Sequence, residues 1–324
     1  MVKRPPELYR DCTSIGNSAG WPEVSRRAMP TSIQEAFEDH VEPRDGRWTV
    51  RYVNAIAVGL QLGTALAILI LILVGRADYC APLVQRYSVY TELPGGAVTF
   101  TPAERQIGCL PPAWVLFTMA LITGLKHALV LLPPVFRRHY DWGTAGLNAF
   151  AWPEYAITAP MGTFTLLLLV GVNELSVLVA LASYLSWVNL LGGLVPELTL
   201  WLLRRTKHGA KLVNCPAMVW LPFAVTGLMT IAPWSVFFAY YFTAVTQRPP
   251  GSDAPPLFLN ISFISTFTLY FGFAVVFAAQ RIAERVNWKF GRRHPYVWMI
   301  ANDVFSMLEK LLLTWFLVTG VLIR

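Results

Sequence analysis

Charged residues are scarce in this sequence: only 14% of its 324 residues are Asp, Glu, Lys or Arg, whereas 55% are hydrophobic. A soluble domain carries about a quarter charged residues, so the composition argues against a soluble fold. The hydrophobic residues are concentrated in long runs, as is typical of membrane proteins. The net charge of +7 is then explained by basic connecting loops, and we expect no nucleic-acid partner.

Signals for secretion, metal binding and catalysis are also missing. The first 48 residues are polar and contain no apolar core of the signal-peptide type, so we expect the N-terminus to stay in the cytoplasm. The four cysteines do not have metal-ligand spacing, and we predict neither a metal site nor an enzyme. Cys80 and Cys109 share one loop. They form either a disulfide or two free thiols, because spacing alone does not show proximity.

Seven segments are long and apolar enough to cross a bilayer as helices, for which about 20 residues are needed. We expect them between Arg51 and Arg76, from about Pro111 to Phe136, from about Trp142 to Asn173, from Glu174 to about Leu203, from about Asn214 to Arg248, between Asp253 and Arg281, and from about Pro295 to the C-terminus. We therefore predict an all-α membrane protein, with a polar segment over residues 1–48 and a seven-helix transmembrane domain over residues 49–324.

The loops differ in their content of basic residues. The loops after the second, fourth and sixth spans carry several Lys and Arg residues each, the loop after the third span carries none, and the loop after the fifth carries only Arg248. Short cytoplasmic loops are enriched in Lys and Arg, which places the N-terminus in the cytoplasm and the C-terminus outside. The long loop over residues 76–110 is then extracellular, and its turn residues near Pro94 predict a small hairpin.

Ionisable side chains within the predicted spans are few, and each is a functional candidate because burial in a membrane is costly. They are Lys126, His127, Glu154, Asp303, Glu309 and Lys310. At 1.5 Å per residue, Lys310 and Glu154 lie about 24 and 20 Å from the same face. A desolvated amine can attack an aldehyde to form a Schiff base, which a nearby carboxylate keeps protonated. The alternative is a structural salt bridge between two helices.

Helical spacing sorts the neighbours of Lys310. Ser306 and Asp303 precede it by four and seven residues and share its face, whereas Glu309 points about 100° away. Ser306 can bond either to the lysine nitrogen or to its own helix, and Asp303 can relay a proton or face interfacial water. We expect the long stem of Lys126 to carry its charge towards the cytoplasmic face, and we expect His127 to be either a packed side chain or a proton site.

Several of these residues resemble motifs of the heliorhodopsin family. The sequence Trp152-Pro153-Glu154-Tyr155 is similar to the family's Glu-Tyr counterion motif, and Ser306 with Lys310 is similar to its Ser-x-x-x-Lys retinal motif, including Trp315 five residues on. Further similar elements are Asn189 with Gly192, Gly193 and Glu197, the Pro233-Trp234 pair, and His127, which stands 27 residues before Glu154. The resemblance covers roughly residues 49–324 and includes the inward N-terminus.

The resemblance implies a retinal-binding light sensor. Retinal, all-trans in the dark, would be attached to Lys310 as a Schiff base, with Glu154 as its counterion, Ser306 as a tuning residue and His127 handling a proton after isomerisation. The implied cofactor-binding set also includes Met161, Asn189, Trp234 and Trp315. The family further implies a homodimer in the cell membrane, a slow signalling photocycle without ion pumping, and a downstream partner that the sequence does not name.

Two other functions compete with this interpretation. A light-gated proton channel or transporter is favoured by the additional acids Asp303 and Glu309. A scaffold that has lost retinal is opposed by the joint presence of Lys310, Glu154 and Ser306. The sequence also departs from the family at two places: Gln61 or Leu60 stands where the family has a second pocket histidine, and Pro153 predicts a kink beside Glu154.

Overall fold

The computed structural model describes residues 45–92, 94, 98–204, 216–247, 257–285 and 294–322. The predicted polar segment over residues 1–48 therefore falls almost entirely outside the described residues. The same holds for much of the basic loop sequence used to predict orientation, namely Arg205, Lys207, Lys211, Arg248, Lys289, Arg292 and Arg293.

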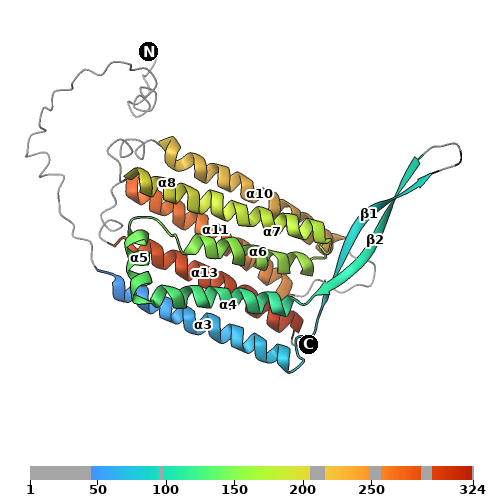
Figure 1. The fold of residues 1–324 in the computed structure, drawn as a ribbon, viewed down its shortest axis with the longest axis horizontal. Helices are drawn as coiled ribbons and strands as arrows, with labels where there is room; N and C mark the ends of the chain where they lie inside the picture. The colour runs from blue at the N-terminus through green and yellow to red at the C-terminus, as the bar shows by residue number, and fades with distance from the viewer. Residues whose placement is uncertain are drawn as a thin grey trace, which may run out of the picture.

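The described chain is mostly helical, and its long helices lie side by side along one direction (Figure 1). They are α3 (Arg47–Leu73), α4 (Pro112–Leu131), α6 (Ala151–Leu169), α7 (Leu175–Asn189), α8 (Val195–Arg204), α10 (Pro216–Thr246), α11 (Leu257–Arg285) and α13 (Tyr296–Leu317). Two short π-helical segments continue them: η3 (Leu190–Leu194) joins α7 to α8, and η4 (Val318–Leu322) follows α13. The short helix α5 (Pro133–Thr144) lies across one end of this bundle, and a β-hairpin projects from the other (Figure 1). We call these the α5 end and the hairpin end.

Five helical segments of the described chain are long and apolar enough to cross a membrane: Arg47–Leu73, Pro112–Leu131, Leu175–Leu203, Trp220–Thr243 and Leu257–Ala283. Helices α6 and α13 run beside them but are more polar. Helix α6 contains Glu154, and α13 contains Asp303, Glu309 and Lys310. Helices α6 and α13 are thus less apolar than the other long helices because they contain the ionisable residues that the sequence analysis proposes for function.

Two of the predicted span boundaries differ in the structure, one of them because of prolines. Helix α4 ends at Leu131 rather than near Phe136, because Pro133 and Pro134 begin α5. The third predicted span begins at Ala151 rather than near Trp142, which belongs to α5. Pro153 therefore lies in the first turn of α6, where a missing backbone N–H breaks no helical hydrogen bond. The predicted interior kink at Pro153 is wrong.

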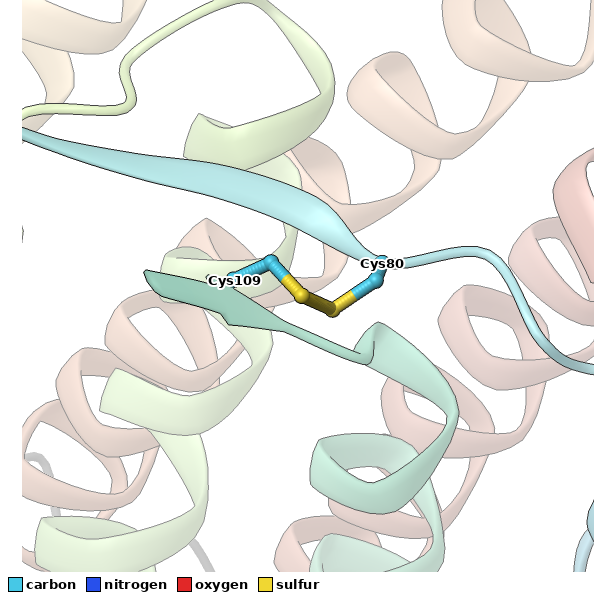
Figure 2. The surroundings of a disulfide bond; sticks show 2 residues. All are labelled: Cys80 and Cys109. Carbon is cyan, nitrogen blue, oxygen red and sulfur yellow. A yellow bond between two sulfur atoms is a disulfide. The ribbon is translucent and has the colours of Figure 1, made fainter. Parts of the chain in front are cut away.

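The hairpin in the long loop is confirmed, and it is longer than the turn signal suggested. Strand β1 (Ala81–Glu92) pairs antiparallel with β2 (Val98–Leu110) from Ala81 opposite Leu110 to Glu92 opposite Val98. Cys80 and Cys109 form a disulfide at its base, with their Cα atoms 5.5 Å apart (Figure 2). The backbone N–H of Val84 also donates to the carbonyl of Asn173, 2.9 Å away, in the turn between α6 and α7. The hairpin is thus attached to the bundle at its base.

Two glycines in η3 let neighbouring helices approach α7. A Cβ built on Gly193 would lie 2.2 Å from the ring of Trp152 in α6, and one on Gly192 would lie 2.2 Å from Cγ2 of Thr226 in α10. Real Cβ atoms do not come so close to other atoms, because protein interiors are close-packed. Glycine at these two positions therefore brings α6 and α10 to the place where the site described below is built.

A buried polar network ties the α5 end together. The Glu197 side chain is 1% exposed and accepts hydrogen bonds from the backbone N–H of Asn148 at 2.7 Å, from Asn148 Nδ2 at 3.2 Å and from Trp152 Nε1 at 2.8 Å. The guanidinium Nη2 of Arg281 lies 3.9 Å from Glu197 Oε1. One carboxylate therefore joins α8, α11 and the turn that starts α6.

Removing this carboxylate is expected to destabilise the bundle. Breaking a buried ion pair from one side costs about 3–5 kcal/mol, because the remaining charge and donors lose their partner. We expect Glu197→Ala to lower the unfolding free energy by that amount, measured by chemical denaturation in mixed micelles. Glu104→Ala is the matched control, since Glu104 pairs with Arg86 on the exposed hairpin. Equal stability of the two variants would contradict a structural role for Glu197.

Candidate functional site

The amine of Lys310 is held inside the bundle by groups from two helices. The residue is 3% exposed, and its Nζ forms an ion pair with Oε1 of Glu154 in α6 and donates to Oγ of Ser306 at 2.9 Å. The ring of Tyr155 faces the same nitrogen, with its centroid 4.8 Å away, a cation–π distance. The structure thus brings together Lys310, Glu154 and Ser306, as helical spacing and depth predicted.

The surroundings of Glu154 stabilise a negative charge on its carboxylate. It lies in the first turn of α6, where free backbone N–H groups and the helix dipole favour an anion. Its Oε1 also accepts hydrogen bonds from Thr123 of α4 and Thr158 of α6, both at 2.8 Å. Its Oε2 is buried and has no hydrogen-bond partner within the described part of the chain, so one acceptor position remains open beside the amine.

The two threonines were not predicted. Thr158 follows Glu154 by four residues, so helical spacing could have identified it as a neighbour on the same face. Thr123 lies in a different helix, 31 residues before Glu154. Sequence spacing gives no signal for such a contact, which depends on how α4 packs against α6.

A second buried ion pair lies on the α5 side of Lys310. Lys126 Nζ is 3.2 Å from Oδ1 of Asp303, and the two side chains are 8% and 5% exposed. Nδ2 of Asn54 is 3.4 Å from Oδ2 of the same aspartate. The prediction that Lys126 extends towards the membrane surface is wrong, because a buried carboxylate is within reach. Asp303 is buried as well, which excludes the alternative that it faces interfacial water.

His127 is connected to this second pair through Asn54. Its Nδ1 lies 2.7 Å from Oδ1 of Asn54, while Nδ2 of Asn54 donates to the carbonyl of Val50 and to Asp303. The accepting oxygen of Asn54 therefore faces the histidine, so Nδ1 of His127 carries the ring proton. Its Nε2 is buried and has no hydrogen-bond partner among the residues described.

An apolar cavity adjoins Lys310 and is lined by α6, α7, η3, α10, α11 and α13. Most of its lining is aromatic, aliphatic or glycine, and the polar exceptions include Asn189, Thr226, Thr230 and Glu309. Lys310 is the one amine in that lining. The aromatic side chains are Trp152, Tyr155, Phe223, Tyr270, Phe271, Phe273 and Phe277. A concave apolar site with a few polar groups suits a flat, hydrophobic ligand.

Not every residue of the predicted cofactor-binding set lines this cavity. Asn189 does. Trp234 instead packs behind the wall, with its ring 5.6 Å from that of Tyr270. Trp315 donates to Thr64 Oγ1 at 3.3 Å, and Met161 packs against the hydrophobic core. A contact between these last three residues and a chromophore stays a prediction.

The chromophore implied by the family fits the residues that are present. An aldehyde needs an amine that reaches an apolar cavity, and Lys310 provides it. The resulting cationic nitrogen needs a buried anion, and Glu154 has an oxygen in place and a second one without a partner.

Comparison with known proteins supports this arrangement. The family model of the heliorhodopsins matches residues 50–322, which includes every long helix of the bundle. No curated protein matches the chain. The chain belongs to the heliorhodopsin family, and it is an integral membrane protein of the retinal-binding photoreceptor type.

Proposed function

We propose that this protein is a light sensor in which Lys310 binds retinal covalently, Glu154 is the counterion, and the photocycle signals slowly without pumping ions. The observation that carries the proposal is the position of Lys310, whose amine adjoins an apolar cavity and also touches Glu154 and Ser306. A purely structural salt bridge would need no cavity beside it.

When bound, retinal supplies absorption of visible light and a light-driven change of double-bond geometry, starting from the all-trans form. The residues of the chain hold a proton on the attached nitrogen, exclude water and offer a group that can accept a proton. Glu154, supported by Thr123 and Thr158, holds a proton on the Lys310 nitrogen. The aromatic walls exclude water, which strengthens that electrostatic interaction. Nε2 of His127, which has no hydrogen-bond partner among the described residues, would accept a proton in the buried region next to the site when the ring is neutral.

We further propose seven transmembrane helices with a cytoplasmic N-terminus and an extracellular C-terminus. Three observations support this. The described helices alternate in direction along the chain (Figure 1), and α6 and α13 have the place of spans within the bundle. The Cys80–Cys109 disulfide lies at the hairpin end, and disulfides persist in oxidising compartments. Family membership is the support for a homodimer in the cell membrane.

A light-gated proton channel or transporter is the second candidate. Asp303 is buried and Glu309 lines the cavity, so acids are available. A conductor needs linked ionisable or hydrated groups on both sides of the site. Towards the hairpin end, the described residues of α13 and η4 after Lys310 offer only Thr314 and Thr319 as hydroxyl or ionisable side chains. This favours the sensor.

The first test of the proposal concerns attachment. Lys310→Ala removes the amine that adjoins the cavity, so we expect complete loss of visible absorption when the purified protein is incubated with all-trans retinal. Lys126→Ala is the matched control and should form pigment, since Lys126 is paired with Asp303 instead. Pigment in Lys310→Ala would overturn the proposal.

The counterion can be tested by titration. Without its carboxylate, a cationic nitrogen in an apolar site loses its proton more easily. We expect Glu154→Gln to move the alkaline loss of visible absorption to lower pH by about 1–3 units, and to red-shift the remaining protonated pigment. Glu174→Gln, in the α6–α7 turn, should change neither quantity. A normal titration of Glu154→Gln together with a shifted one for Asp303→Asn would assign the counterion to Asp303.

The proposed orientation predicts which ends of the chain can be labelled from outside. A tag placed before Met1 should be protected from a membrane-impermeant reagent in intact cells, and a tag after Arg324 should react. Permeabilised cells serve as the control, because both tags should then be labelled. The opposite pattern in intact cells would contradict the orientation inferred from basic loops and from the disulfide.

A further inference from the structure

Lys126 is a buried cation that does not line the cavity beside Lys310. Its Nζ lies 3.2 Å from Asp303, and Asp303 precedes Lys310 by seven residues on α13, about 10 Å along the helix axis. We infer that Lys126 is an electrostatic barrier, which prevents a proton released at Lys310 from exchanging with the α5 end of the bundle. This inference rests on the proposed function.

The groups around Lys126 would otherwise form a proton relay. Asp303 faces it from α13, Asn54 from α3, and His127 is its neighbour on α4. His139 of α5 is 4% exposed, lies within electrostatic range of the Lys126–Asp303 pair, and has an Nε2 without a hydrogen-bond partner in the described structure. Two imidazoles and a carboxylate therefore lie near Lys126 on the α5 side of the site, and the Asn54 amide bridges His127 and Asp303.

The ammonium group interrupts that relay in two ways. An opposite charge in contact with a carboxylate favours its ionised form, so Asp303 is engaged with Lys126 and is a poor carrier of a proton. A migrating proton would also have to pass a fixed positive charge in a medium of low dielectric constant, where repulsion is strong. Fixed cations exclude protons from membrane pores by the same effect.

A barrier at Lys126 explains how the protein can contain the buried acids Asp303 and Glu309 and still act as a sensor that does not conduct protons. With the route to the α5 end closed, a proton that leaves the Lys310 nitrogen stays within the buried region around Glu154 and His127. It then returns to the same nitrogen. Its return should be slow and insensitive to the pH of the medium.

The experiment compares four pigments reconstituted in lipid nanodiscs: wild type, Lys126→Met, Lys126→Arg and Lys126→Met/Asp303→Asn. After a flash, the rate at which the Lys310 nitrogen recovers its proton is followed by absorption at several pH values. We expect Lys126→Met to recover at least tenfold faster than wild type, with a rate that rises as the pH falls. Lys126→Arg retains the charge and should behave as wild type. The double variant lacks the carboxylate of the relay and should be slow again.

A measurement without retinal tests the charge state of the pair itself. Infrared spectra of the apoprotein should show the carbonyl band of a protonated carboxyl in Lys126→Met that is absent from the double variant, because the buried Asp303 has then lost its cation. Lys126→Gln, whose amide can still donate to Asp303, repeats both measurements if Lys126→Met does not fold.

Three results would overturn the inference. Slow, pH-insensitive recovery in Lys126→Met and Lys126→Gln would exclude a barrier while leaving the sensor intact. Fast, pH-dependent recovery in the wild type would show that the route is already open. Pigment formation in Lys310→Ala would refute the proposed function itself, and the inference with it.

Discussion

The ion pair between Lys310 of α13 and Glu154 of α6 is the interaction on which the arrangement of this bundle depends. Two charges placed among apolar helices are costly unless each is paired and hydrogen-bonded. Here Ser306 and the ring of Tyr155 support the amine, and two threonines support the carboxylate. The groups that make the burial tolerable also fix the relative positions of α4, α6 and α13. The same requirement places Glu154 in the first turn of α6, where the helix dipole favours its charge.

Helix α13 repeats this solution about two turns nearer the α5 end. Seven residues before Lys310, Asp303 is paired with Lys126 of α4 and hydrogen-bonded by Asn54 of α3. One helix thus makes an ion pair with α6 near the cavity and another with α4 closer to the α5 end. The polarity that makes α13 unlike an ordinary apolar span is the source of both contacts. Packing and the proposed function therefore depend on the same side chains.

The parts of the site that could be predicted from the sequence follow from the geometry of a single helix. Spacing of four residues placed Ser306 beside Lys310, and counting residues put Glu154 at a similar depth. Contacts between helices gave no such signal. Lys126 and Asp303 are 177 residues apart, and Lys126 was therefore assigned to the membrane surface. Thr123 and Asn54 were missed for the same reason, because polar residues in separate spans acquire partners only when the helices pack.

The fold, like the site, could be predicted where it follows from local sequence and could not be predicted where it depends on contacts between helices. Long apolar runs and turn residues predicted the helices and the hairpin, while Pro133 and Pro134 moved boundaries that hydrophobicity alone could not place. Gly192 and Gly193 shape the cavity through close approaches to α10 and α6, and nothing in their local sequence indicates which helices approach. Aromatic residues were abundant enough that composition could not separate Trp152, which lines the cavity, from Trp234 behind it.

The central claim is that the amine of Lys310 carries the chromophore, and a chemical measurement can locate that bond directly. The pigment is reduced with borohydride to make the attachment permanent, digested, and analysed by tandem mass spectrometry. The account predicts a retinyl group on the peptide that contains Lys310 and on no other lysine. A retinyl group on Lys126, or none on Lys310 in a sample that absorbs visible light, would contradict it.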